Sequence, residues 1–179
     1  MKIARALSPT AQKYVLQWGE LGTKWGINRT VAQIHALLYI SQRPLTAGEI
    51  AETLAAAQSN VSTSLKELQG WRLIRTVPVL GDRREHFESL PDVWEMFKIV
   101  LDERKRREVD PALEMLRECS AALGKSPADA HMARRLTAMK DFFEEASDWY
   151  TEVKPIPIST LRRLMRLGGK VQKFLGLGG

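Results

Sequence analysis

Hydrophobic residues recur every three to four positions along most of this chain, which is the period of an amphipathic helix. In the segment 45–89 this spacing predicts two short helices, the first of which is opened by Thr46 or Ala47. The small residues 55–57 fit a bend between the two helices. The second helix carries an apolar stripe that faces the core, formed by Val61, Leu65 and Leu68.

Two extended segments follow the second helix. Residues 74–77 and 86–89 contain the β-branched and aromatic side chains that favour strands, and residues 81–84 (GDRR) predict a basic turn between them. Two helices followed by a basic-tipped hairpin make the outline of a winged helix-turn-helix. The predicted fold is therefore mostly α-helical with a small β-wing.

Further helices are predicted on both sides of this region. Ser8 predicts the start of an N-terminal helix that runs to about Trp25, and Thr30 can cap a second helix over 31–42. His35 lies on the apolar face of that second helix, which favours a core histidine over a metal ligand. Downstream of the wing the pattern predicts helices over 91–109, 111–123 and 128–152, with a break at Asp110-Pro111.

These elements divide the chain into four expected parts. Residues 1–29 form an N-terminal dimerisation helix, 30–90 the winged helix-turn-helix DNA-binding domain, and 91–153 a helical dimerisation and effector region. Residues 154–179 form a proline-rich linker and a basic amphipathic tail, in which residues 159–179 hold five cations and no acid. The tail fits a flexible or partner-docked segment, and equally a segment that contacts a membrane surface or DNA.

Charge and composition narrow the class of protein. The chain has 179 residues, a formal net charge of +6 and a pI near 9.6, which favours a polyanionic partner. No signal peptide is recognisable at the N-terminus and no apolar run is long enough for a membrane span, so we expect a cytoplasmic protein without stable membrane insertion. The single cysteine, Cys119, excludes an intrachain disulfide and is expected to be buried and inert.

The residue patterns of common enzymes are missing. The sequence has no glycine-rich phosphate loop, HExxH, GxSxG or CxxC motif. The serines at 59, 62 and 64 have no base placed by sequence to activate them. We therefore expect no enzyme, no cofactor and no metal site.

The second short helix has a polar face opposite its apolar stripe. Ser59, Thr63 and Lys66 lie on this face, with Ser62 and Glu67 beside them. Small hydroxyl groups and a lysine can approach a base edge or a phosphate closely. The pattern is typical of a DNA-recognition helix.

Residues 59–97 (SNVSTSLKELQGWRLIRTVPVLGDRREHFESLPDVWEMF) resemble the multiple-antibiotic-resistance-regulator (MarR) family of winged helices, and within it the glycine-betaine-synthesis-repressor (GbsR-like) branch. The NVSxxLxEL helix, the tryptophan after it, the GDR turn and the FExxxDVWExF entry into a long helix carry the resemblance, which covers about residues 18–99. It implies a homodimeric transcriptional regulator, with repression the expected mode, that binds double-stranded DNA at a pseudopalindromic operator and responds to a small ligand. The resemblance also implies that Asp82 stabilises the wing and that DNA is contacted by Gln58, Ser59, Asn60, Ser62, Thr63, Lys66, Arg83 and Arg84.

Two positions depart from the family pattern. Arg72 stands where the turn after the recognition helix usually has a glycine, and Gly70 could serve that turn instead. Ala57 stands where relatives often carry a capping hydroxyl, so Ser59 could cap the helix and be withdrawn from DNA.

The effector site is not identified by the sequence. A quaternary ammonium ligand of the kind that the namesake branch senses would need an aromatic cage, but each tryptophan is more often a core residue. Sequence alone does not show whether these side chains converge. The available aromatic residues are Trp18, Trp25, Trp71, Trp94, Trp149 and Tyr150.

Two other functions fit parts of the pattern. In a protein-docking adaptor built on the winged fold, Lys66, Arg83 and Arg84 would be ordinary surface charges. In a peripheral membrane or RNA-associated protein, the segment 159–179 would carry the function. Replacing the three cations distinguishes a docking adaptor from a DNA-binding protein, because only DNA binding needs their charge. Deleting the tail distinguishes the membrane or RNA-associated protein, because only that function depends on the tail.

Overall fold

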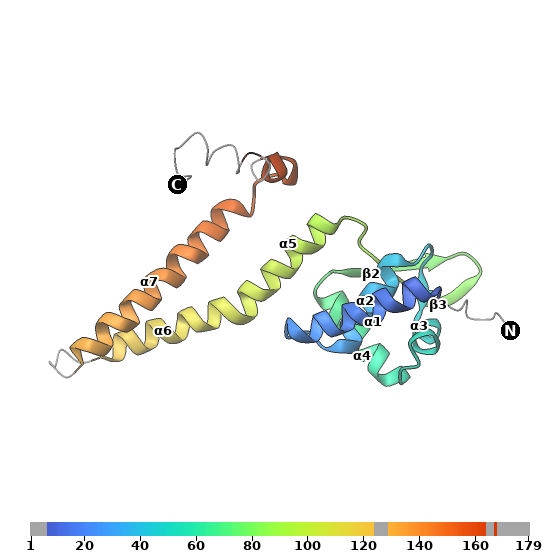
Figure 1. The fold of residues 1–179 in the computed structure, drawn as a ribbon, viewed down its shortest axis with the longest axis horizontal. Coiled ribbons are helices and arrows are strands. Elements are labelled where there is room, and N and C mark those ends of the chain that lie inside the picture. The colour runs from blue at the N-terminus through green and yellow to red at the C-terminus, as the bar shows by residue number, and fades with distance from the viewer. Residues whose placement is uncertain (1–6, 124–128, 164–166, 168–179) are drawn as a thin grey trace. The chain divides into compact units, whose positions relative to one another are not determined.

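The computed structural model describes residues 7–123, 129–163 and 167. The chain divides into two compact units, Met1–Val100 and Leu101–Gly179, which are described separately below. The fold is mostly α-helical with a small three-stranded antiparallel sheet, as the sequence predicts for a winged helix (Figure 1). The division between the two units falls within α5 (Val93–Arg104).

Two helices at the start of the first unit pack closely on each other. Ser8 caps α1 (Pro9–Lys24) by accepting from the amide of Ala11, as predicted. A Cβ at Gly22 of α1 would lie 2.5 Å from the Cβ of Ala32, so glycine allows this close approach to α2 (Arg29–Ile40). Asn28, not Thr30, caps α2, and its Oδ1 accepts from the amides of Thr30 and Val31; the helix also ends two residues earlier than predicted.

The helix-turn-helix follows as predicted. Thr46 ends the short strand β1 (Leu45–Thr46) and caps α3 (Ala47–Leu54), where it forms a reciprocal capping box with Glu49. Ala55 then adopts φ 49°, which turns the chain into α4 (Gln58–Gly70). Local side-chain hydrogen bonds therefore define the start of α3.

The wing is longer than predicted. Strands β2 (Ile74–Val79) and β3 (Asp82–Ser89) pair antiparallel around Leu80 and Gly81, so Arg83 and Arg84 lie in β3 and not in the turn. Gly81 adopts φ 82°, a conformation that favours glycine. Strand β1 was not predicted; it pairs with β3, which makes β3 the central strand in the order β1-β3-β2.

A single hydrophobic core holds this first unit together. The inward faces of α2, α3 and α4 meet on it, and α1, β3 and the start of α5 close its sides. The predicted stripe of α4 is buried, because Val61, Leu65 and Leu68 are almost fully covered. The other large, fully buried side chains are Val15, Val31, Ile34, Leu37 and Ile50.

The helix after the wing does not stop at Asp110-Pro111 as predicted. A π-helical turn, η1 (Lys105–Val109), leads directly into α6 (Asp110–Ala122), and the amide of Asp110 donates to the carbonyl of Lys105. Proline lacks an amide proton and its ring clashes with the carbonyl four residues earlier in a straight helix. The wider π turn accommodates Pro111, so the chain stays helical.

The second unit is a helical hairpin. Helices α6 and α7 (Ala130–Val153) lie side by side and run in opposite directions (Figure 1). Leu113 and Leu116 of α6 are buried, whereas α7, which is described over its whole length, has no buried residue. The end of α7 is joined to the last turn of α5, because the Tyr150 hydroxyl donates to Asp102 at 2.6 Å and Lys154 pairs with the same carboxylate at 3.0 Å.

Two further predictions concern this unit. Cys119 is exposed on α6, not buried, because the apolar stripe of that helix passes through Leu113 and Leu116 instead. Residues 158–163 of the predicted tail are helical, and its remainder lies outside the described residues apart from Leu167. None of the described helices combines the length and the low polarity that crossing a membrane requires.

Candidate nucleic-acid interface

The polar face of α4 is open to solvent. Its core side is fixed by the buried stripe described above, so residues on the opposite side of the helix must point outward. Every α4 residue predicted to contact DNA is exposed. These residues are Gln58, Ser59, Asn60, Ser62, Thr63 and Lys66.

The start of α4 leaves Ser59 free to contact DNA. Gln58 is the first residue of the helix and Ala57 its cap, without a side-chain hydrogen bond. Ser59 therefore lies inside the first turn and does not cap the helix, so the alternative in which capping withdraws it from DNA does not hold.

The turn after α4 is made by Arg72, a residue with a Cβ. Arg72 adopts φ 60°, while Gly70 is the last helical residue and does not make the turn. The amide of Leu73 donates to the carbonyl of Leu68, which closes the helix end. The direction of the wing is thus set by the left-handed backbone conformation of Arg72.

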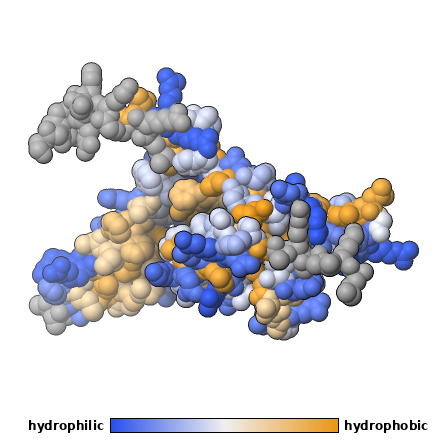
Figure 2. All heavy atoms as spheres, turned by 45° about the vertical axis from the view of Figure 1, so that its right-hand side comes forward, coloured by the Kyte–Doolittle hydropathy of each residue, from blue (hydrophilic) through white to orange (hydrophobic). Residues whose placement is uncertain are grey.

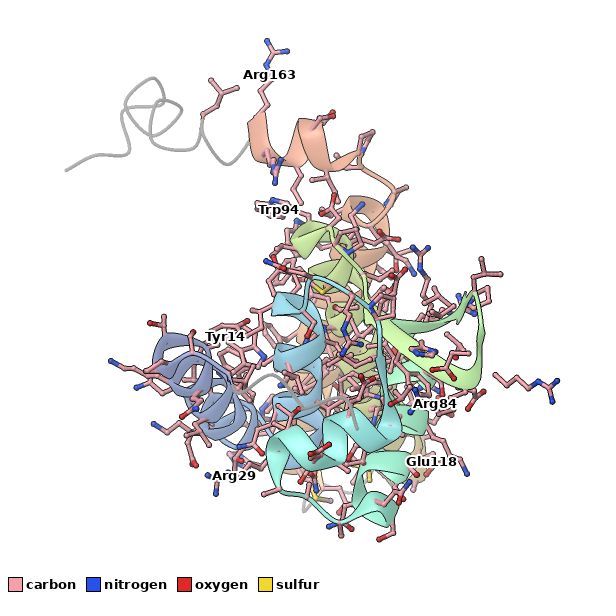
Figure 3. All side chains as sticks on the ribbon, turned by 90° about the vertical axis from the view of Figure 1, so that its right-hand side faces the viewer. Tyr14, Arg29, Arg84, Trp94, Glu118 and Arg163 are labelled. Carbon is pink, nitrogen blue, oxygen red and sulfur yellow. The ribbon has the colours of Figure 1, made fainter. Side chains whose placement is uncertain are left out.

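A groove of about 800 Å³ lies between α4, the N-terminus of α3 and the wing. Three predicted α4 residues, Gln58, Ser62 and Lys66, line it on one side, and Arg84 of β3 lines it on the other. Figure 3 shows Arg84 on the β2–β3 hairpin. Predicted residues that are distant in sequence, from the helix and from the wing, therefore border one concave surface.

The remaining predicted residues lie outside this groove. Ser59, Asn60, Thr63 and Arg83 are exposed but do not line it. Among the described residues Arg83 has no ion-pair partner, so its charge is available to an outside anion.

Asp82 and Arg84 form a local pair next to the turn between β2 and β3. Asp82 accepts from the backbone amide of Arg84 at 3.0 Å and from its Nε at 2.9 Å, and its second oxygen accepts from Nη2. The Arg84 guanidinium holds the pKa of Asp82 well below its usual range, and Asp82 raises the pKa of Arg84. The pair limits the directions that the Arg84 side chain can take.

Polar residues of the groove that the sequence did not identify include Gln69 and Glu85. Gln69 lines it and donates to Thr76 Oγ1 at 2.9 Å, which links α4 to β2. It lies seven residues after Ser62 and so on the same helix face, a periodicity that could have identified it. Glu85 also lines the groove, and its place follows from the register of β3, which the sequence did not predict.

One further cation of the wing is engaged within the sheet. Arg75 of β2 pairs with Glu88, which lies opposite it in the register, with Nη2 and Oε1 2.6 Å apart. Its charge is therefore partly neutralised before any ligand binds.

A second concave site, the aromatic pocket, has a volume of about 370 Å³ and lies in the first unit. Trp18, Trp25 and Trp71 converge on it, whereas Trp94 and Trp149 do not line it. Trp18 and Trp25 meet edge to face with centroids 5.9 Å apart. The pocket is also lined by Tyr14, Tyr39, Phe97 and His35.

His35 is the most polar group on the wall of the aromatic pocket. Its Nε2 lies 3.3 Å from Ser89 Oγ, and burial lowers the pKa of its imidazole to about 4. The ring is therefore neutral at pH 7. Over the described part of the chain, no three histidine, cysteine, aspartate or glutamate side chains lie close enough together to hold a metal ion.

Comparison with known proteins agrees with this geometry. Residues 25–85 match the model of the MarR family. A crystal structure described as a transcriptional regulator is 24% identical with a TM-score of 0.64, and the match covers 82% of this chain and 96% of that chain. A search of curated proteins finds no match.

Two other solved structures are more distant. The Staphylococcus aureus MepR–DNA complex is 22% identical over 73% of this chain and 90% of that chain, with a TM-score of 0.38. The transcriptional regulator Tm0710 from Thermotoga maritima is 18% identical over 78% and 92%, also with a TM-score of 0.38. The segment 25–85, which holds α2, α3, α4 and most of the wing, is thus similar to the MarR family, and the fold of the chain is that of a winged helix.

Proposed function

We propose that this protein is a sequence-specific DNA-binding transcriptional regulator of the GbsR-like branch of the MarR family, which represses its target genes in the cytoplasm. The observation that carries the proposal is the groove shared by α4 and the wing, because helix residues and Arg84 border the same surface. A duplex presents base edges in its major groove and phosphates beside them, so one concave protein surface can engage both.

The residues of the interface divide into two roles. Lys66, Arg83 and Arg84 are cations and contact phosphates, which supplies most of the affinity and makes it depend on salt. Gln58, Asn60 and Ser62 have neutral polar side chains that read base edges from the first turns of α4, with Ser59 and Thr63 beside them. Loss of one base contact should cost about 1–3 kcal/mol of binding free energy.

The regulator acts as a homodimer on a pseudopalindromic operator. A symmetric dimer would place two copies of α4 about 34–36 Å apart, one turn of DNA. The exposed apolar side chains of the α6–α7 hairpin support this proposal, because a free hairpin would leave them in water. Figure 2 shows hydrophobic residues, in orange, open to solvent on one face of the molecule.

The small ligand that modulates DNA binding occupies the aromatic pocket. Its volume and its aromatic walls suit a compact apolar molecule, and the neutral His35 offers one polar contact. Because the wall includes Trp71, directly after α4, occupancy can be coupled to the position of the recognition helix. Quenching of tryptophan fluorescence by a ligand, abolished in Trp18→Ala, would support this assignment.

Fluorescence anisotropy with DNA from the region upstream of the protein's own gene tests the proposed function. The wild type is compared with an Arg83→Ala/Arg84→Ala double variant over a range of salt concentrations. A matched control, Arg134→Ala/Arg135→Ala, removes the same charge from exposed positions of α7. We expect weaker binding and a salt slope shallower by about 0.9 per lost phosphate contact for the wing variant alone.

Two results would contradict the proposal. Equal, weak binding of all three proteins to every duplex would leave nonspecific attraction of a basic protein, and would favour the docking adaptor. Equal losses in the wing and α7 variants would mean that net charge, and not the groove, determines affinity.

A further inference from the structure

His86 is a buried imidazole at the base of the wing that the proposed interface does not use. It lies in the central strand β3, with Thr46 of β1 and Val77 of β2 opposite it, and its residue is 4% exposed. Side chains alternate between the faces of a strand, so His86 shares its face with Arg84 and Asp82. A polar ring in this position needs partners for its nitrogens.

Each ring nitrogen of His86 lies near an acceptor, one from the backbone and one from a side chain. Nδ1 lies 2.9 Å from the backbone carbonyl oxygen of Arg84, and Nε2 lies 3.5 Å from Asp82 Oδ2. A neutral imidazole carries one proton and can donate to one of these acceptors, whereas an imidazolium donates to both. If the proton stays on Nδ1, the neutral ring turns a lone pair toward the carboxylate, which is repulsive.

The three side chains therefore form one unit, here called the wing clamp: Asp82, Arg84 and His86. Asp82 accepts from the Arg84 guanidinium, and the two ring nitrogens of His86 lie beside the Arg84 carbonyl oxygen and the Asp82 carboxylate. The clamp residues are two and four positions apart on one strand, so His86 is linked to Arg84 through direct contacts.

We propose that His86 is a positioning residue that, as an imidazolium, fixes the Asp82–Arg84 pair and so directs the wing arginine toward DNA. This inference rests on the proposed function and adds a proton-dependent step to it. When the ring loses its Nε2 proton, Asp82 loses one donor and Arg84 loses part of its support. DNA binding should therefore strengthen as the pH falls, because a lower pH favours the imidazolium form.

The other charges near His86 lie at the β1 side of the sheet. Thr46, paired with His86, is hydrogen-bonded to the carboxylate of Glu49, which also acts electrostatically on Arg84. Arg43 donates to Glu49 at 2.7 Å, so this carboxylate already has a cationic partner. Val77 on the β2 side is apolar, so Asp82 is the acid nearest to the ring.

The charge state of the ring can be measured without DNA. Long-range ¹H–¹⁵N correlation spectra of the free protein report which nitrogens of each histidine carry protons. We expect an imidazolium signature for His86 that grows as the pH is lowered, and protonation of Nδ1 in the neutral form. A ring that is neutral at pH 6 with its proton on Nε2 would overturn the proposal, whatever the protein binds.

The functional effect is measured as operator affinity at pH 6, 7 and 8 for wild type, His86→Gln and His131→Gln. Glutamine can donate one hydrogen bond but does not titrate, and His131 is an exposed histidine of α7 that serves as the matched control. We expect wild type and the control to bind about fivefold more tightly at pH 6 than at pH 8, and the His86 variant to lose this dependence.

The outcomes separate this proposal from the proposed function. Identical pH profiles of wild type and His86→Gln, with tight binding by both, would overturn the role of His86 and leave DNA recognition intact. Absence of specific binding by wild type at every pH would overturn DNA recognition itself. The ¹H–¹⁵N spectra of the free protein would then decide whether the clamp forms. If His86→Gln does not fold, Asp82→Asn removes the negative charge that faces the ring instead, and a pH dependence unchanged from wild type would overturn the clamp.

Discussion

The winged unit and the α6–α7 hairpin differ in how they bury hydrophobic side chains. In the winged unit, helices from three directions and the sheet enclose one core, and side chains such as Ile34 and Ile50 are fully covered. In the hairpin, α6 and α7 cover little more than Leu113 and Leu116. Large apolar side chains remain open along it: Met115, Met132, Met139, Phe142 and Trp149.

The difference shows which part of the molecule can be stable alone. Two helices have only one shared seam, whereas the winged unit covers its hydrophobic faces on several sides. On α7 the open positions Met132, Met139, Phe142 and Trp149 follow a spacing of seven and three residues, which forms one stripe. We infer that the winged unit folds by itself and that the hairpin completes its burial with a second copy of the chain.

The sharpest test of the winged core is Ile34→Ala. Ile34 is 0% exposed, so the change leaves a cavity among packed side chains, and we expect a loss of about 2–5 kcal/mol in the free energy of unfolding. Urea unfolding followed by tryptophan fluorescence measures it. Leu80→Ala, at a fully exposed turn position, is the control and should change stability by less than about 0.5 kcal/mol. Equal effects of the two changes would refute the distinction between core and surface.

The corresponding change in the hairpin is Phe142→Glu. Phe142 is 64% exposed, so we expect little effect on helix content, but a charge placed in the stripe should weaken dimerisation by at least about 2 kcal/mol. Sedimentation over a range of protein concentrations measures the monomer–dimer equilibrium. Thr137→Glu adds the same charge on the opposite face of α7 and should leave the equilibrium unchanged. A variant that stays dimeric would place the interface elsewhere.

The two regions also differ in how well the sequence predicts them. In the winged unit the spacing of Val61, Leu65 and Leu68 predicted the buried face of α4, and the cap at Ser8 was found from local chemistry. Such features depend on residues close in sequence. The length of the wing and the strand β1 were not predicted, because pairing of β1 with Phe87 and His86 joins residues about forty positions apart.

The wrong predictions in the rest of the chain also concern features that depend on more than the local sequence. Asp110-Pro111 looked like a helix end because proline disrupts a straight helix, but a π turn accommodates it. Cys119 looked buried because the helix is amphipathic, although the hairpin covers only a narrow stripe. For the candidate interface, the sequence identified exposed residues of α4, while the groove that unites Gln58 and Lys66 with Arg84 required the tertiary fold.

A third prediction concerns helix capping, which also distinguishes the two regions. Glu49 closes the capping box of α3, whereas α6 and α7 begin without a side-chain cap. The hydrogen bond from Arg43 and those from Thr46 lower the pKa of Glu49 to about 2 from a usual value of 4.5. Because the folded-state pKa is the lower one, this stabilisation is present above pH 4.5 and is lost as the pH falls toward 2.

Glu49→Gln should therefore cost about 1–2 kcal/mol of stability at pH 7, since Arg43 is largely exposed and its attraction is screened. The difference between variant and wild type should shrink between pH 4.5 and pH 2. Thermal unfolding at several pH values measures it. Glu145→Gln on α7, where no capping box forms, should show no such trend. A constant difference at all pH values would rule out the charge of Glu49 as the cause.

The smallest expected effect is a gain in stability at the turn after α4. Arg72 adopts φ 60°, which costs a residue with a Cβ about 1–2 kcal/mol, while glycine reaches this conformation freely but loses more entropy on folding. Because the conformational cost of arginine exceeds the additional entropy cost of glycine, we expect Arg72→Gly to raise the free energy of unfolding by about 0.5–1 kcal/mol. Arg72→Ala is the control, because it removes the charge but keeps the Cβ and should give no gain. If alanine stabilised the protein as much as glycine, charge repulsion and not backbone conformation would be the cost at this position. The result matters for the interface, since this residue sets the angle at which the wing leaves the recognition helix.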